Sequence, residues 1–561
     1  MLFDNTSTEG NAPIFPIAMV VVIIGVIIMP LGLLMGVIAL AILHWQPRMK
    51  WLILVMSLVL VAVTFRAMPF TINAFFTLHH HALMSAFHGT GLRAFDPYLW
   101  ISAFAFSGIF GVLLHVLLGR VSTIQRHLKR VSQGQGIQSA TFLSEKKIQK
   151  ALDKIQSSAI PGGSILGVNQ MTGEPVVLTD KQANCHVLVL GTTGSGKTVT
   201  LCNMIESIIQ RGLMLIILDG KGDVALANRI EAYAKQHNRK CHVFKMQGQS
   251  AHYNPIASGG ITSKKDRIIE LRTWSEDHYR KIAEGYLQTI FQLIERFKIQ
   301  VDLFTLSKYL RADKFYDLAR AQKDEAAITL IESLEGREKD VSSLLCEIEN
   351  MVNSEIGDLF NTQHENSFNL KQALDENAIV YFCLQPLAFP AYAECLGKLI
   401  INDIKALAAS QLSENKNNPI YCLFDEFSIF AGDQIVNLIN QGRSAGIHAI
   451  LSTQSLCDIE RKGDQALIGQ IVNNCNHFII QRQNHHDDAE RSAQLIGTTD
   501  GFQLTSKIES KPQATQTGTV RLTKEFIVHP DDIKRLKQGE GIIVNKQQFR
   551  VEIVGVRRSK I

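Results

Sequence analysis

The stretch HVLVLGTTGSGKTVT, residues 186–200, decides the fold class of this 561-residue chain. A short apolar segment typical of a buried strand leads directly into a glycine-rich loop that ends in Gly-Lys-Thr. The loop fits the pattern GxxxxGK[ST], in which the glycines let backbone N–H groups wrap around phosphates. The helix expected after the loop adds its positive amino end. The stretch therefore predicts a strand, a P-loop and a helix that bind a nucleotide.

The loop and the first helical turn supply the expected nucleotide-binding residues. These are Gly191, Thr192, Thr193, Gly194, Ser195, Gly196, Lys197, Thr198 and Val199. Lys197 is expected to reach the β- and γ-phosphates, and the Thr198 hydroxyl to bind Mg²⁺. ATP and Mg²⁺ are therefore the expected cofactors.

A P-loop needs an acidic partner at the end of another apolar strand, and YCLFDEF, residues 421–427, supplies one. We expect Asp425 to hold the Mg²⁺ shell and Glu426 to polarise the attacking water. An apolar segment followed by Asp-Glu is common, and by itself it also describes a strand that ends in two solvated carboxylates. Its combination with the P-loop favours the catalytic interpretation.

The stretch NQGRSAGIHAILSTQS, residues 440–455, contains two further candidates. Gln454 follows a predicted strand, at the edge of a parallel sheet where ligand-binding residues gather, so it can contact the γ-phosphate or orient water. Arg443 has two interpretations that the residues alone do not separate. It is either a surface charge or a guanidinium inserted into the site of a neighbouring subunit.

The order of apolar segments predicts an α/β fold with a mostly parallel sheet, because strands buried on both faces alternate with helical patterns. The expected strands are residues 186–190, 213–218, 242–244, 378–384, 420–424, 448–452 and 477–480. Residues 264–365 interrupt this alternation with helical spacing only, which predicts an all-helical insertion.

These patterns divide the chain into five parts. Residues 1–119 are the expected membrane region, 120–180 a connector with the start of the nucleotide-binding domain, 181–262 its first part, 263–368 the inserted all-α domain, and 369–561 its second part with C-terminal strands.

The membrane region contains apolar blocks at residues 14–43, 51–78 and 98–119. Each is long enough to cross a bilayer, and basic residues after the first and third blocks place the long remainder in the cytoplasm. Arg66 interrupts the second block. That block is either a third crossing, with the arginine paired or reaching the interface, or it is re-entrant or lipid-peripheral. We expect a multi-pass protein in contact with membrane lipid.

Composition adds little beyond this organisation. The net charge of +5 permits contact with DNA or an anionic membrane without indicating either. No CxxC pair occurs among the nine cysteines, so zinc-finger and thioredoxin-type sites have no support.

Beyond about residue 136 the chain resembles the coupling-protein ATPases of type IV secretion and bacterial conjugation. The matching segments are SATFLSEKKIQKAL, GTTGSGKT, DGKGD, NPI, LFDEF, GRSAGIH, STQS, IVNNCNHFIIQR and EFIVHPDDIKRLKQGEGII, in that order, with the helical insertion between NPI and LFDEF.

The resemblance implies a RecA-like nucleotide-binding domain, a bacterial inner-membrane anchor and a homohexamer around a channel. It also implies that Arg443 acts in trans, and that single-stranded DNA with relaxosome proteins, or protein substrates, is passed to type IV secretion channel components. The chain departs from the family at Gly220, where Asp-Pro-Lys-Gly is usual, and in its expected third crossing.

Two other functions use the same motor. One is a double-stranded DNA translocase of the chromosome-pump type, which the large helical insertion disfavours. The other is a coupling ATPase for protein effectors only, which the sequence does not separate from a DNA-coupling protein.

Overall fold

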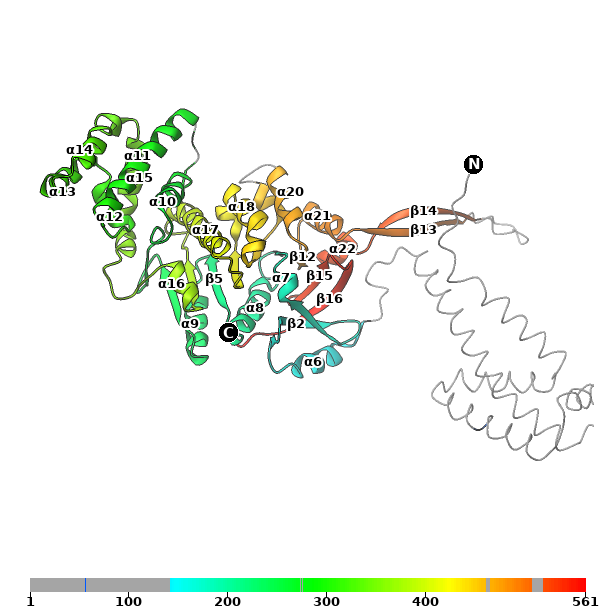
Figure 1. Ribbon diagram of the computed structural model, residues 1–561. Coiled ribbons are helices and arrows are strands. Elements are labelled where there is room, and N and C mark those ends of the chain that lie inside the picture. The colour runs from blue at the N-terminus through cyan, green and yellow to red at the C-terminus, as the bar shows by residue number, and fades with distance from the viewer. Residues whose placement is uncertain (1–55, 57–141, 273, 275, 461–464, 507–517) are drawn as a thin grey trace, which may run out of the picture. The chain divides into compact units, whose positions relative to one another are not determined.

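The structure is a computed structural model that describes Met56 and residues 142–272, 274, 276–460, 465–506 and 518–561 (Figure 1). The membrane segments expected within residues 1–119 lie outside the described residues, apart from Met56. Within the described part of the chain, no helix combines the length and apolar character needed to cross a bilayer. The fold below belongs to one compact unit, formed by Gly136–Asp500 and Lys524–Ile561.

Seven parallel strands form the centre of this unit, in the spatial order β12-β4-β11-β10-β5-β9-β6. Their bounds are β4 (Val187–Leu190), β5 (Met214–Asp219), β6 (Cys241–Lys245), β9 (Ile379–Cys383), β10 (Ile420–Asp425), β11 (Ile447–Thr453) and β12 (His477–Ile480). All seven predicted strands are therefore confirmed, and so is the mostly parallel α/β sheet.

Helices cover both faces of the parallel strands, because alternate residues along each strand point to opposite sides. In β5, Leu215 and Ile217 pack against α8 (Lys197–Gln210) and α9 (Val224–Gln236). Ile216 and Leu218 belong to the other core, which includes α17 (Pro390–Ser413) and α18 (Asp433–Gln441). The result is a sheet between two helical layers (Figure 1).

Antiparallel strands extend the sheet beyond β12. These are β1 (Ala159–Ile160), β2 (Gly163–Asn169), β3 (Pro175–Thr179), β15 (Glu540–Asn545) and β16 (Arg550–Val556). β15 pairs with β12, and β16 pairs with β2. Segments from the beginning and the end of this unit are thus joined on this side of the sheet. β13 (Thr498–Ser506) and β14 (Gly518–Phe526) form a separate two-stranded sheet, and most of both strands belongs to the chain's other unit, which includes Gly501–Thr523.

The regular elements between β7 (His252–Tyr253) and β8 (Ser367–Phe368) are all helices among the described residues. They are α10 (Ile261–Ile269), α11 (Asp277–Arg296), α12 (Leu303–Tyr309), η3 (Ala312–Phe315), α13 (Tyr316–Ala321), α14 (Glu325–Glu332), η4 (Arg337–Lys339), α15 (Ser342–Val352) and η5 (Gly357–Phe360). β7 and β8 pair in parallel, so the chain enters and leaves this helical segment side by side.

Shorter helices complete the unit. They are α6 (Glu145–Asp153), α7 (Asp180–Ala183), α16 (Leu370–Asp375), η6 (Phe427–Phe430), η7 (Gly442–Ala445), α19 (Leu456–Glu460), α20 (Gln465–Asn474), α21 (His486–Ile496) and α22 (Pro530–Lys534).

Three buried histidines lie at the amino ends of the adjacent strands β12, β4 and β11. They are His477, His186 and His448. The ring of His186 contacts the carbonyl oxygen of Ile439 at 2.9 Å and accepts from the backbone N–H of Ala449 at 3.2 Å. Burial lowers the pKa of each histidine to about 4. The folded protein therefore holds all three neutral at neutral pH.

This burial predicts an acid-sensitive stability. Below about pH 6.5 a histidine in the unfolded chain binds a proton, whereas these three stay neutral in the folded protein until about pH 4. We expect each to reduce the free energy of unfolding by about 1–2 kcal/mol between pH 7 and pH 5. In urea unfolding, His448→Gln should lose less stability over this interval than the unchanged protein. The control His278→Gln, at an exposed position, should lose as much stability as the unchanged protein does. The expectation is contradicted if the free energy of unfolding falls equally between pH 7 and pH 5 in the unchanged protein and in His448→Gln.

Candidate nucleotide-binding site

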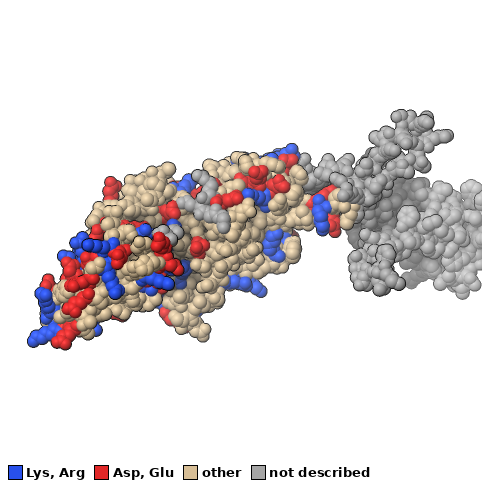
Figure 2. All heavy atoms as spheres, turned by 90° about the horizontal axis from the view of Figure 1, so that it is seen from above, with Lys and Arg blue, Asp and Glu red and all other residues tan. Residues whose placement is uncertain are grey.

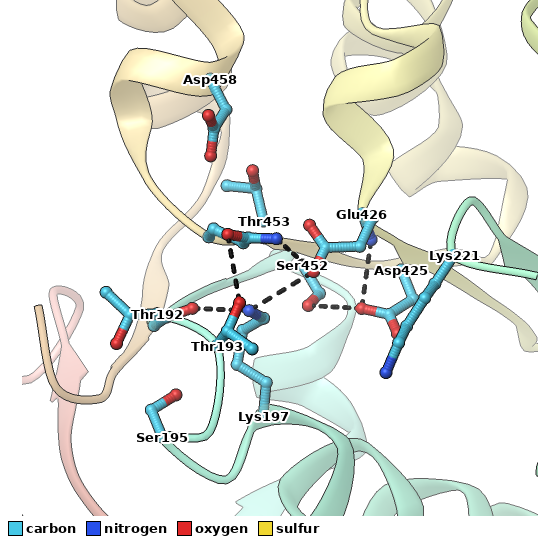
Figure 3. A network of polar contacts seen from close by, with 12 residues as sticks. Thr192, Thr193, Ser195, Lys197, Lys221, Asp425, Glu426, Ser452, Thr453 and Asp458 are labelled. Atoms are coloured by element: carbon cyan, nitrogen blue, oxygen red, sulfur yellow. Dashed lines mark hydrogen bonds and ion pairs between the residues drawn. The ribbon is translucent and has the colours of Figure 1, made fainter. Parts of the chain in front are cut away.

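The site lies where the parallel strands end, because the carboxyl ends of β4, β10 and β11 share one edge of the sheet. The loop of residues 191–196 follows β4, Glu426 follows β10 and Gln454 follows β11. These segments are far apart in the sequence, yet their side chains meet (Figure 3).

Glu426 is at the centre of the contacts. Its Oε1 lies 3.5 Å from Lys197 Nζ and accepts a 3.4 Å hydrogen bond from Gln454 Nε2. The carboxamide oxygen of Gln454 in turn accepts from Thr193 Oγ1 at 3.4 Å. The structure therefore brings Lys197 and Glu426 together beside the loop (Figure 3), and these hydrogen bonds add Gln454 to them, as the sequence predicts.

The loop has the backbone conformation that a phosphate cradle requires. Gly194 and Gly196 have positive φ angles of 77° and 112°, which side chains disfavour. A Cβ at Gly196 would also lie 3.0 Å from the backbone nitrogen of Gly539. Gly196 is the N-cap of α8, so the free N–H groups of the first helical turn point toward the space that the loop encloses. This geometry suits an anion.

Lys197 is a buried cation. Its side chain is 8% exposed, and Nζ donates to the carbonyl oxygen of Gly191 at 2.5 Å. Its contact with the Glu426 carboxylate is longer, at 3.5 Å. Burying an ammonium group is costly without a close counter-charge. A phosphate at the loop would provide that charge.

Asp425 ends β10 and is 7% exposed. Its Oδ1 accepts hydrogen bonds from Ser452 Oγ at 2.8 Å and from the backbone N–H of Glu426 at 3.1 Å. Burial raises the pKa of Asp425 to about 6, and the charges of Asp219 and Glu426 act in the same direction, against the Ser452 hydrogen bond. A divalent cation would offset this accumulation of negative charge.

The residues present fit Mg²⁺. The carboxylate of Asp425 and the hydroxyl of Thr198, in the first turn of α8, are the oxygen donors that this ion prefers.

The other predicted nucleotide-binding residues are placed as follows. Thr198 and Val199 are half-buried. Thr192 donates from its backbone N–H and from its hydroxyl to the carbonyl of Arg482.

Glu426 has a positive φ angle of 47°, which is uncommon for a residue with a side chain. Such conformations cost about 1–3 kcal/mol and persist where the surroundings impose them. Here the conformation turns the chain out of β10 while the carboxylate contacts Lys197 and Gln454. The strain coincides with the residue that we expect to act on water.

Arg443 does not join these residues. It is exposed on η7, which precedes β11 and so lies at the amino edge of the sheet. β11 contains seven residues, which separate Arg443 from Gln454 by about 20 Å. Arg443 therefore does not serve the site of its own chain.

The packing around position 220 explains why this residue is glycine and not the proline that is usual in the family. A Cβ at this position would lie 2.9 Å and 3.0 Å from the carbonyl oxygens of Glu426 and Asp425. The N–H of Gly220 also donates to the Asp425 carbonyl at 2.9 Å. Proline has no such N–H, so glycine joins the ends of β5 and β10 in a way that proline cannot.

Sequence reasoning missed Gln481, which follows β12. Its buried carboxamide accepts from Ser195 Oγ at 3.1 Å and donates to Thr200 Oγ1 at 2.8 Å. Gln481 therefore fastens the loop to the start of α8. The polar run QRQ after an apolar strand is the signal that could have indicated it.

Comparison with known proteins identifies the family. Residues 172–557 match the family described as the type IV secretion-system coupling protein DNA-binding domain. The chain belongs to the type IV secretion-system coupling-protein family. Its match covers the loop, Asp425, Glu426, Gln454 and the helical segment.

Individual relatives are distant. The type 4 coupling protein DotL of Legionella pneumophila is 22% identical over 386 residues, which are 56% of this chain and 49% of that protein. The chain thus matches about half the length of this relative. The solved conjugative coupling protein TrwB has a TM-score of 0.49 at 12% identity, over 74% of this chain and 92% of that chain. TrwB is also solved in complex with ADP and Mg²⁺.

VirB4 of Thermoanaerobacter pseudethanolicus is a further similar structure. Its TM-score is 0.46 at 14% identity, over 72% of this chain and 99% of that chain.

The contacts of Gln481 predict a role in holding the loop. Gln481→Leu keeps the approximate volume but leaves the Ser195 and Thr200 hydroxyls without these partners, at a cost of about 1–3 kcal/mol. We expect at least a tenfold weaker affinity for a fluorescent ATP analogue, measured by anisotropy. Gln494→Leu, on the exposed side of α21, is the matched control and should bind as the unchanged protein does. Full affinity in Gln481→Leu would contradict the assignment.

Proposed function

We propose that this protein is an ATP-hydrolysing motor of a type IV secretion or conjugation system, and that it moves substrate toward the secretion channel. The observation that carries the proposal is the contact of Glu426 with both Lys197 and Gln454 beside the P-loop, in a chain of the coupling-protein family. A P-loop lysine, a carboxylate and a glutamine at one sheet edge are the groups that nucleotide hydrolysis uses.

Each residue has a role in this chemistry. The backbone N–H groups of the loop hold the phosphates, and Lys197 exchanges its Gly191 carbonyl for the β- and γ-phosphate oxygens. Thr198 and Asp425 would hold Mg²⁺, which would supply positive charge against the phosphates. Glu426 orients and polarises the attacking water, and Gln454 contacts the γ-phosphate or that water.

Arg443 completes the site from a neighbouring subunit in this proposal. Its position at the amino edge, away from the site of its own chain, supports such a role. An arginine supplied in trans stabilises the charge of phosphoryl transfer and can contribute about a thousandfold or more. A ring of six subunits would place one Arg443 against each site.

The remaining parts of the chain also have roles in this motor. Residues 181–262 and 369–561 form the RecA-like nucleotide-binding domain, and 263–368 the all-α domain inserted into it. The membrane segments of residues 1–119 anchor the motor in the inner membrane, with the ATPase in the cytoplasm. Because the subunits would be fixed in the membrane, the movements that hydrolysis drives would carry substrate across it.

The family match favours DNA as the substrate, because the matching domain is described as DNA-binding. We propose single-stranded DNA with its relaxosome proteins. Lysine, arginine, aspartate and glutamate are interspersed over the helical segment (Figure 2). A surface of mixed charge suits a protein partner better than a phosphate backbone, so in this proposal the helical segment contacts the relaxosome proteins and not the DNA itself.

ATP turnover with and without DNA tests the proposal. In the detergent-purified protein we expect single-stranded DNA to stimulate hydrolysis, and less so at higher salt, because phosphate contacts are screened. Lys197→Ala and Glu426→Gln should each lower turnover by at least about a hundredfold. Lys235→Ala, on the exposed side of α9, is the matched control and should keep turnover unchanged.

Two outcomes would change the proposal. Full turnover in Lys197→Ala would contradict the site. Unchanged turnover at every DNA concentration, with hydrolysis still dependent on Lys197, would instead favour a coupling ATPase for protein substrates only.

A further inference from the structure

A second cluster of ligating side chains lies at the base of the helical segment, away from the P-loop. It consists of His252, Asp358 and His364. His252 is in β7, where the chain enters the helical segment. Asp358 is in η5 and His364 lies between η5 and β8, where the chain returns. The cluster therefore joins the two connections of the helical segment.

The side chains converge closely. One ligand atom from each of the three residues lies within 4.8 Å of the other two. His364 Nε2 is 3.5 Å from Asp358 Oδ1, and the rings of His252 and His364 have centroids 3.9 Å apart. Asp358 and His364 are exposed and His252 is half-buried, so an ion can reach the cluster from solvent.

The hydrogen bond of His252 fixes which nitrogen can bind an ion. His252 Nδ1 lies 2.8 Å from the carbonyl oxygen of Asp358. A carbonyl oxygen only accepts, so Nδ1 carries the proton, and in the neutral ring Nε2 keeps its lone pair. Histidines that bind metals usually donate their other N–H in this way, often to a backbone carbonyl.

The backbone also holds His252 in place. Its N–H donates to the carbonyl of Asn366 at 2.9 Å, within the parallel pairing of β7 and β8. The next residue, Tyr253, is fully buried and donates from its hydroxyl to Asp403 of α17 at 2.6 Å. His252 is therefore held by β8 through its backbone and stands next to a residue that is hydrogen-bonded to α17.

We propose that His252, Asp358 and His364 bind a divalent transition-metal ion, with Zn²⁺ as the best-fitting ion. Two imidazoles and one carboxylate form a ligand set that zinc accepts, with water in the fourth position. Mg²⁺ and Ca²⁺ prefer oxygen ligands only, so this site differs in chemistry from the one formed by Thr198 and Asp425.

The bound ion would fasten the entry and exit of the helical segment to each other. The rings of His252 and His364 are stacked with an interplanar angle of 19°, so the exposed Asp358 and His364 side chains would rotate on binding to bring the ligand atoms to the distances of about 2.0–2.2 Å that zinc requires. The ion would then limit movement of the helical segment relative to the sheet. The site does not depend on the proposed ATPase function.

Zinc titration of the full chain tests the proposal. The protein is purified without a histidine tag, freed of metal with a chelator and titrated with Zn²⁺ by calorimetry without nucleotide. We expect His364→Ala and Asp358→Asn to lose one bound ion per chain, or to bind that ion at least about tenfold more weakly. Both positions are exposed, so the variants should fold.

A matched control separates this site from other histidines. His485 and His486 are also exposed, beside Asp487 and Asp488 at the start of α21. The double change His485→Ala/His486→Ala should leave the stoichiometry and affinity unchanged. Co²⁺ should give the visible spectrum of a nitrogen- and oxygen-ligated site that disappears in His364→Ala. Equal zinc stoichiometry and affinity in the unchanged protein and His364→Ala would overturn the proposal.

Discussion

The parallel alignment of β4, β11 and β10 is the constraint on which the site depends. Parallel strands end at the same edge of a sheet, so the residues that follow them meet whatever their separation in the sequence. Lys197 and Glu426 are more than two hundred positions apart, and their side chains are 3.5 Å apart. The helical segment between them does not disturb this edge, because the paired strands β7 and β8 hold its two connections together.

The same edge is stabilised by residues that have no part in the chemistry. Gln481 fastens the loop to α8, and Gln483 Nε2 donates to the carbonyl of Gln454 at 3.1 Å. The end of β12 thus supports both the phosphate cradle and the glutamine beside it. Since β12 also pairs with β15, the antiparallel strands are connected to the loop through the hydrogen bonds of β12 and Gln481.

The sequence predicted the parallel strands to within about one residue, because each is a short apolar segment between turn-forming residues. The meeting of Lys197, Glu426 and Gln454 followed from the rule for strand ends. Gln481 was not predicted, because its position beside the loop depends on β12 lying next to β4, and spatial order leaves no local pattern. The pairing of β2 with β16 joins residues almost four hundred positions apart and was missed for the same reason. The positive φ angle of Glu426 reflects tertiary packing that overrides local preference.

The most direct test of the account is an experimental structure of the assembled protein with a non-hydrolysable ATP analogue and Mg²⁺. We expect Lys197 Nζ to leave the Gly191 carbonyl for the phosphates, with Mg²⁺ between Thr198 and Asp425. Glu426 and Gln454 should face the γ-phosphate, opposite Arg443 of the adjacent subunit. A nucleotide bound away from the loop of residues 191–198, or phosphates that leave Lys197 on its carbonyl, would contradict the account.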